Sequence, residues 1–152
     1  DVLESGEVKA QVIPSKTIPQ GLVACMNFNP DITPEENFRE MKNSLKTVKT
    51  GLVTFSIKDT TVDGVEVKKD HFMGIKDKKI MTCVPDKLDA AYQTIKAMID
   101  SLTSIVTILF GEDVKSEDAE ALVARLSEEH DDIDFDLREG NQPVYSFIIG
   151  IE

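Results

Sequence analysis

The chain has 152 residues, of which 41% are hydrophobic and 30% are charged, an ordinary composition for a globular protein. A chain of this length forms about one domain, or two small lobes that share a core, and buries ~68–70% of its unfolded surface. Its formal net charge of −11 repels phosphate backbones and anionic lipids, which argues against nucleic acid and membrane surfaces as partners. The charge favours a protein partner with a basic face, although solubility alone also explains it.

The sequence also indicates the cellular compartment in which the protein is found. No apolar run approaches the ~18–20 residues of a membrane span, and no signal peptide opens the chain, so we expect a cytoplasmic protein. Cys25 and Cys83 lie in apolar segments, which predicts reduced core cysteines rather than a disulfide. The first residue is Asp1 instead of Met, and we expect a fragment of a longer protein.

The first 50 residues predict a short strand and two helices. Apolar residues within Val8–Ile13 alternate before Pro14, as in a strand. The apolar run Leu22–Phe28 favours a helix, because Pro19 fits a first helical turn. Thr33–Glu36 has the pattern of a capping box and starts a second helix, which we expect to continue to Gly51. Its apolar face recurs every three or four residues and comprises Phe38, Met41, Leu45 and Val48.

Residues 51–84 predict a run of short strands. Val53, Phe55 and Ile57 alternate with polar residues, as in a half-buried strand. Asp63-Gly64 is a hairpin signal, and a second polar turn at residues 77–79 precedes another strand from Ile80.

The remaining residues predict helices that alternate with strands. Asp86 can cap a helix whose apolar face comprises Leu88, Ala91, Tyr92, Ile95, Met98, Ile99 and Leu102. Ile105–Phe110 is a continuous apolar run, typical of a fully buried strand, and Ser116 is expected to cap the next helix. Residues 133–137 alternate as a half-buried strand, and Val144–Ile151 follows a turn as a final apolar strand.

This order of elements predicts an α/β fold with a mixed sheet that contains a β meander and is covered by helices. A boundary near Gly51 would divide the chain into a small first lobe, residues 1–50, and a complete second lobe, residues 51–152.

The sequence contains none of the familiar catalytic motifs. It has no phosphate-binding glycine loop for ATP or a dinucleotide, no serine elbow and no clustered zinc ligands. The aspartates of residues 131–136 are not a calcium loop, because Leu137 and Pro143 occupy the positions of the required Gly and Glu. We therefore expect no catalytic residue, no metal and no cofactor in this chain.

One polar cluster, Asp59–Gly64, stands out within the strand-rich region. Its side chains can simply stabilise turns by bonding to nearby backbone groups. Alternatively, the cluster is a loop presented to a ligand or partner, with Lys68 and Lys69 beside it as anion-binding groups or as solvated edge charges.

Five segments together resemble one family: Pro14–Gly21, Val48–Gly51, Asp59–Val65, Phe110–Val114 and Gly140–Tyr145. In order and spacing they are similar to the C-terminal domain of the bacterial dihydroxyacetone-kinase-like proteins, the ATP-using subunit of fatty acid kinase. The resemblance covers nearly the whole chain. From about Ile105 onward it extends to the second lobe of the DegV fatty-acid-binding proteins.

The resemblance implies a role for the chain within a larger protein. ATP and magnesium would bind to an N-terminal domain of the parent, outside this chain. A separate DegV-type carrier would hold the fatty acid, whose carboxylate is phosphorylated, and this domain would engage the carrier and the other domains of the parent. An asparagine-rich loop of the family is missing upstream, so we expect a truncated first lobe without a complete lipid pocket. The closing turn also reads Gly140-Asn141-Gln142 where two glycines are expected.

Docking is therefore the only role that we carry over to particular residues. The candidate contact residues are polar or amphipathic, lie in predicted turns and belong to the matched segments: Thr17, Gln20, Asp59, Thr60, Thr61, Asp63, Gln142 and Tyr145. Three alternatives remain open at this point. The chain can be a lipid-binding or small-molecule-binding domain with the meander and Leu22–Phe28 around a pocket, a structural or dimerising module, or a part that completes the kinase active site.

Overall fold

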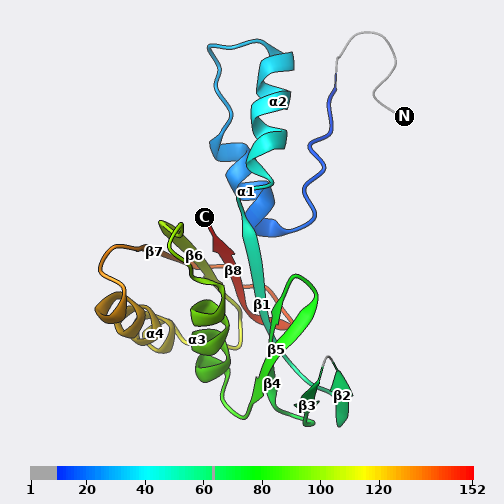
Figure 1. Ribbon diagram of the computed structural model, residues 1–152, viewed down its shortest axis with the longest axis vertical. Helices are drawn as coiled ribbons and strands as arrows, with labels where there is room; N and C mark the ends of the chain where they lie inside the picture. Colours follow the sequence, from blue (N-terminus) through cyan, green and yellow to red (C-terminus); the bar gives the residue numbers. More distant parts are fainter. Residues whose placement is uncertain (1–9, 63) are drawn as a thin grey trace. The chain divides into compact units, whose positions relative to one another are not determined.

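The computed structural model describes residues 10–62 and 64–152 (Figure 1). The chain divides into two compact units, residues 1–47 and residues 48–152. The division between Thr47 and Val48 lies a few residues before Gly51, near which a boundary was expected from the sequence. Two of the predicted contact residues, Thr17 and Gln20, belong to the first unit, and the other six belong to the second.

Two helices form the described part of the first unit. Helix α1 spans Ile18–Met26, with Thr17 as its N-cap and Pro19 in its first turn, as predicted. Helix α2 spans Pro34–Ser44, and the predicted capping box is present. Its Thr33 hydroxyl accepts a hydrogen bond from the Glu36 amide at 3.2 Å, and the Glu36 carboxylate accepts one from the Thr33 amide at 3.0 Å.

Three predictions for the first unit are wrong. Residues 10–16 form neither helix nor strand, so the strand predicted around Val8–Ile13 is not found in its described part, and Val8 itself lies outside the described residues. Helix α2 ends at Ser44 instead of Gly51, because side chains of Ser44 and Thr47 bond to carbonyls of its last turn and the chain then enters a strand. Cys25 is exposed rather than buried, since the core-facing side of α1 carries its neighbours Val23 and Ala24.

The second unit is built on a six-stranded sheet with the order β5-β4-β1-β8-β6-β7. The strands are β1 (Lys49–Phe55), β4 (Phe72–Lys76), β5 (Lys79–Val84), β6 (Ile105–Phe110), β7 (Asp134–Glu139) and β8 (Tyr145–Ile151). Strands β6 and β7 are parallel, and every other neighbouring pair is antiparallel. The predicted mixed sheet with a meander is confirmed, although β1 ends at Phe55 and leaves Ile57 exposed in a loop.

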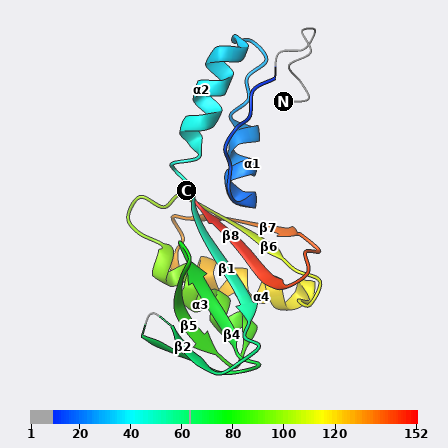
Figure 2. The ribbon, with the colours of Figure 1, turned by 90° about the vertical axis from the view of Figure 1, so that its right-hand side faces the viewer.

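Helices α3 (Lys87–Met98) and α4 (Ser116–Glu129) lie on the same face of this sheet (Figure 2). Asp86 caps α3 as predicted, since its carboxylate accepts hydrogen bonds from the amides of Leu88 and Asp89, both at 2.9 Å. The core between sheet and helices buries aliphatic and aromatic side chains, among them Val53, Ile95, Ile108, Leu126, Phe147 and Ile149. Burial of such a face supplies most of the free energy that favours folding.

Three sequence details of the second unit need correction. Lys115, not Ser116, is the N-cap of α4, and the Ser116 hydroxyl donates instead to the Glu120 carboxylate at 3.1 Å. Strand β6 is not fully buried but alternates, because α3 and α4 cover only one face of the sheet, and Ile105 is exposed. Leu102 follows the end of α3 and is 86% exposed, so it does not belong to the helix's apolar face.

Candidate functional site

A small hairpin outside the main sheet carries the central group of predicted contact residues. Strands β2 (Thr60–Val62) and β3 (Val65–Val67) pair antiparallel, as the Asp63-Gly64 signal predicted. Gly64 has a φ of 82°, a conformation that glycine adopts without a steric penalty. Asp63 itself lies outside the described residues.

The hairpin is held at its base by a few contacts. The Asp59 carboxylate accepts a hydrogen bond from the Lys69 amide at 2.7 Å, which ties the two ends of the hairpin together. Ser56 bonds through its backbone to His71 and Asp70, both at 2.8 Å. The Val67 side chain is only 1% exposed and anchors β3 against the rest of the unit. Asp59 is thus a structural residue at least in part, as the turn interpretation predicted.

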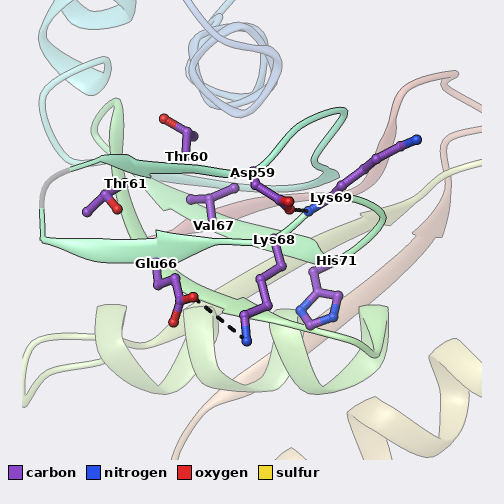
Figure 3. A pocket seen from close by; sticks show the side chains of 8 residues that line it. All are labelled: Asp59, Thr60, Thr61, Glu66, Val67, Lys68, Lys69 and His71. Carbon is purple, nitrogen blue, oxygen red and sulfur yellow. Dashed lines mark hydrogen bonds and ion pairs between the residues drawn. The ribbon is translucent and has the colours of Figure 1, made fainter.

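An open hollow of about 590 Å³ lies at this hairpin (Figure 3). Its walls are formed by Asp59, Thr60, Thr61, Glu66, Val67, Lys68, Lys69 and His71. Glu66, Lys68 and His71 lie on one side, with a long ion pair of 3.8 Å between Lys68 and Glu66. Thr60 and Thr61 point to opposite sides, and neither hydroxyl forms a hydrogen bond with a described residue. The hollow therefore offers hydroxyl, carboxylate, ammonium and imidazole groups to a polar surface.

Gln142 and Tyr145 lie in a different place: Gln142 is in the turn that leads from β7 into β8, and Tyr145 is the first residue of β8. The Gln142 side-chain amide group donates hydrogen bonds to the carbonyl oxygens of Leu109 at 3.2 Å and Tyr145 at 3.0 Å. Its backbone carbonyl oxygen accepts from the Glu112 amide at 3.3 Å. Gln142 therefore joins this turn to the loop between β6 and α4, and its side chain is occupied by internal contacts. Tyr145 is 36% exposed.

A charged network holds the loop between β6 and α4. The Lys87 ammonium group donates to the Asp113 carboxylate at 2.7 Å and to the Asp113 carbonyl at 2.6 Å. The hydroxyl of Ser146, a residue that is only 1% exposed, donates to the same carboxylate at 2.8 Å. Partial burial raises the pKa of Asp113, but the hydrogen bonds from Lys87 and Ser146 and the charge of Lys87 outweigh burial and leave that pKa below its ordinary value.

A β-bulge explains why Ser146 reaches Asp113. Val53 of β1 pairs with Phe147 and Thr54 pairs with Tyr145, so Ser146 has no partner in the ladder with β1. A bulge re-aims the extra residue, and here it directs the serine to the loop. Gly111 makes this close approach possible, because a Cβ atom there would collide with the carbonyl oxygens of Tyr145 and Gln142.

The two predicted residues of the first unit have local structural roles. The Thr17 hydroxyl accepts a hydrogen bond from the Gln20 amide at 3.3 Å and caps α1. The Gln20 side chain accepts from the Lys16 amide at 2.9 Å and donates to the Leu45 carbonyl at 3.2 Å. Of the seven predicted residues that the structure describes, Asp59, Thr60 and Thr61 lie together around one hollow, and the other four do not line it.

Sequence reasoning missed Lys87 and Ser146, and it did not single out Asp113 or Val144 within the matched segments. Lys87 and Asp113 are 26 residues apart, and Asp113 and Ser146 are 33 apart, so no local pattern signals their contact.

Across residues 10–62 and 64–152, His, Cys, Asp and Glu side chains form no group of three or more able to hold a metal ion. Within the same ranges, no helix combines the length and apolar character needed to cross a membrane.

Comparison with known proteins defines the class of this domain. The family model for the C-terminal domain of FakA-like fatty acid kinase proteins matches residues 2–152, and the chain belongs to this family. The resemblance seen in the five sequence segments is thereby confirmed.

Two relatives and one solved structure illustrate the relationship. The chain is 45% identical over 141 residues to protein YloV of Bacillus subtilis (93% of this chain, 26% of that protein) and 34% identical over 146 residues to an uncharacterised protein of Staphylococcus aureus strain USA300 (96% and 27%). It therefore spans about a quarter of the length of these relatives. The fold is similar to that of the Streptococcus pneumoniae fatty acid kinase B3 protein, which was solved loaded with linoleic acid. The TM-score is 0.53 and the identity 14%, over 80% of this chain and 50% of that one, which supports the predicted DegV-like fold.

Proposed function

We propose that this domain is a non-catalytic docking module of a fatty acid kinase, and that it binds the DegV-type carrier protein that holds the fatty acid. The acyl carboxylate is then phosphorylated by the ATP-binding and magnesium-binding domain elsewhere in the parent protein. The observation that carries the proposal is the family match over residues 2–152, because that family is the C-terminal part of the kinase protein.

The hairpin hollow supports docking as the task of this domain. It gathers polar groups of both charges at a small separate sheet, where the hydroxyls of Thr60 and Thr61 are not engaged by any described residue of the protein itself. Polar side chains that make no internal hydrogen bond can pair with a partner without breaking existing contacts. The family resemblance assigns ATP and magnesium to an N-terminal domain of the parent, and the sequence of this chain contains no phosphate-binding glycine loop of the familiar kinds.

Calorimetric titration tests the proposal directly. The domain is titrated with a fatty-acid-loaded DegV-type carrier in one experiment and with magnesium ATP in another. We expect heat from the carrier alone. Binding of ATP alone would place catalytic machinery in this domain and overturn the proposal, and no heat in either titration would favour a structural or dimerising module.

Salt dependence adds information on how the carrier is recognised. With a formal net charge of −11, the domain should be steered towards a basic face of the carrier, so association should weaken as ionic strength rises. Affinity that is unchanged between low and high salt would contradict this steering.

A second candidate function is supported by a hollow in the first unit. About 310 Å³ of space is lined by Ile13, Phe28, Pro34, Phe38 and Met41, together with the polar residues Gln11, Glu35 and Asn37. Such an apolar lining is typical of small-molecule sites and favours a lipid or another apolar ligand. Titration of the domain with a free fatty acid, in the absence of any carrier, distinguishes this function from docking.

A further inference from the structure

The turn that precedes β8 contains a strained valine. The Tyr145 amide donates a hydrogen bond to the Pro143 carbonyl at 2.8 Å, and Val144 between them has a φ of 73°. These two features define a γ-turn with positive φ, a rare form because its central residue is sterically strained. The strain is greatest for a β-branched side chain, whereas glycine or asparagine adopts this φ readily.

Three hydrogen bonds, two from other parts of the unit and one from within the turn, hold the turn in this conformation. The Thr54 hydroxyl of β1 donates to the Val144 carbonyl at 2.8 Å, and the Gln142 side-chain amide group donates to the Tyr145 carbonyl at 3.0 Å. The Gly111 amide donates to the Ser146 carbonyl at 2.9 Å. A strained residue persists only where its surroundings over-determine it, and such residues cluster at binding sites and ligand clamps.

The valine side chain stays largely outside the core of the domain in this arrangement. It is 62% exposed, and Tyr145 next to it is 36% exposed, so the turn presents two apolar side chains to solvent. Because the backbone is already fixed, little conformational entropy would be lost when these side chains enter an interface. Tyrosine, the residue type at position 145, is enriched among the residues that contribute most to the binding energy of protein interfaces.

We propose that Val144, together with Tyr145, is an apolar anchor that enters a recess on a partner protein. The inference rests on the proposed function, in which that partner is the DegV-type fatty acid carrier. It assigns the apolar part of the contact to this turn and leaves the polar part to the β2–β3 hairpin. The sequence included Tyr145 among the contact residues but did not single out Val144.

The Val144→Gly variant separates an anchor from a merely strained residue. Glycine relieves the strain at positive φ and leaves the three clamping bonds in place, because those bonds use backbone oxygens of residues 144–146. We expect an unfolding midpoint equal to or above that of the wild type, together with carrier affinity that is about tenfold weaker. Val144→Ile, which keeps an apolar β-branched side chain, should retain the affinity.

Leu102→Ala is the matched control, because Leu102 is 86% exposed in another loop of the same unit and is not part of the proposed anchor. All proteins are titrated with the fatty-acid-loaded carrier after their unfolding midpoints have been measured. If the wild type binds and Val144→Gly binds equally well, the anchor is refuted while the docking function stands. Equal weakening by Leu102→Ala or by Val144→Ile also refutes it. If the wild type fails to bind, the proposed function falls, and this inference falls with it.

Discussion

The β2–β3 hairpin and the turn at residues 140–146 both carry predicted contact residues, but their side chains are used in opposite ways. In the hairpin, the hydroxyls of Thr60 and Thr61 form no hydrogen bond within the described residues. In the turn, Gln142 bonds to Leu109 and Tyr145, and its carbonyl bonds to Glu112. A polar turn residue is available to a partner only where local geometry does not already require it, so the turn should contribute apolar contacts and the hairpin polar ones.

The largest effect is expected where the turn and the loop before α4 approach most closely. The Gly111→Ala variant places a Cβ atom against the carbonyl oxygens of Tyr145 and Gln142, and backbone atoms cannot rotate away as a side chain would. We expect the free energy of unfolding to fall by about 3 kcal/mol. In thermal denaturation this corresponds to a midpoint lower by about 6–12 °C. A midpoint within about 2 °C of the wild type would show that the turn is not clamped by this loop.

The next largest effect on stability is expected when the charge of Asp113 is removed. The Asp113→Asn variant weakens the hydrogen bonds from Lys87 and Ser146, and the free energy of unfolding at pH 7 should fall by about 1 kcal/mol, since the carboxylate is partly exposed and screened by solvent. Urea denaturation at several pH values measures this difference.

The pH dependence follows from the lowered pKa of Asp113 in the folded state. The stabilisation is fully present above the pKa of an unfolded aspartate, ~3.9, and is lost as the pH falls through the lower folded-state pKa. The wild type and Asp113→Asn should therefore differ most at neutral pH, and the difference should shrink as the pH falls below the pKa of an unfolded aspartate. Asp100→Asn removes an exposed ion pair with Lys49 at the start of β1, while the amide oxygen of asparagine can still accept the hydrogen bonds from Leu102 and Thr103, so this variant is the control for loss of one negative charge. It should change stability less than Asp113→Asn, because an exposed ion pair contributes little.

The β2–β3 hairpin and the turn at residues 140–146 also differ in how much of their structure could be predicted from the sequence. Local signals such as the Asp63-Gly64 turn, the Thr33–Glu36 capping box and the Asp86 cap act within a few residues and were predicted correctly. The positions of Gln142 and Ser146 depend on strand register, on a bulge and on contacts between residues about 30 apart, none of which leaves a periodic pattern. The positive φ of Val144 is likewise imposed by tertiary contacts against the preference of the residue.

Two predictions made from the sequence, for β6 and for the start of α4, were wrong. The apolar run of β6 predicted burial on both faces, but burial depends on which faces the helices cover, and that is a property of the whole unit. Ser116 has the chemistry of a good N-cap, yet Lys115 takes that position and the Ser116 hydroxyl donates to the Glu120 carboxylate instead. Local propensity decides only where no tertiary contact competes with it.

A smaller effect is expected at the tip of the hairpin. Gly64 has a φ of 82°, and among the described residues that are not its chain neighbours no atom lies within 4 Å of a Cβ atom added there, so Gly64→Ala introduces mainly backbone strain. We expect a loss of about 1 kcal/mol of unfolding free energy or less, measured by urea denaturation. A loss as large as that of Gly111→Ala would mean that the hairpin is clamped as tightly as the turn, which would remove the contrast between them.

The smallest effect on stability is expected for the double substitution Thr60→Ala and Thr61→Ala. Neither hydroxyl bonds to a described residue, so the melting temperature should change by no more than about 2 °C, as for ordinary surface substitutions. Carrier affinity should nevertheless fall, because each hydroxyl is proposed to pair with the partner. Thermal denaturation and calorimetric titration on the same preparation measure both quantities.

Thr54 provides the contrast for this last prediction. Its hydroxyl is bound to the Val144 carbonyl at 2.8 Å, so Thr54→Ala should lower the melting temperature by loosening the γ-turn. If instead the Thr60 and Thr61 substitutions lower the melting temperature strongly while affinity is unchanged, these threonines are structural and the hairpin is not a docking element. The opposite pattern, a stable variant that binds weakly, makes the hairpin a polar contact and the turn a rigid apolar one, since a hydroxyl without an internal partner affects binding without affecting folding.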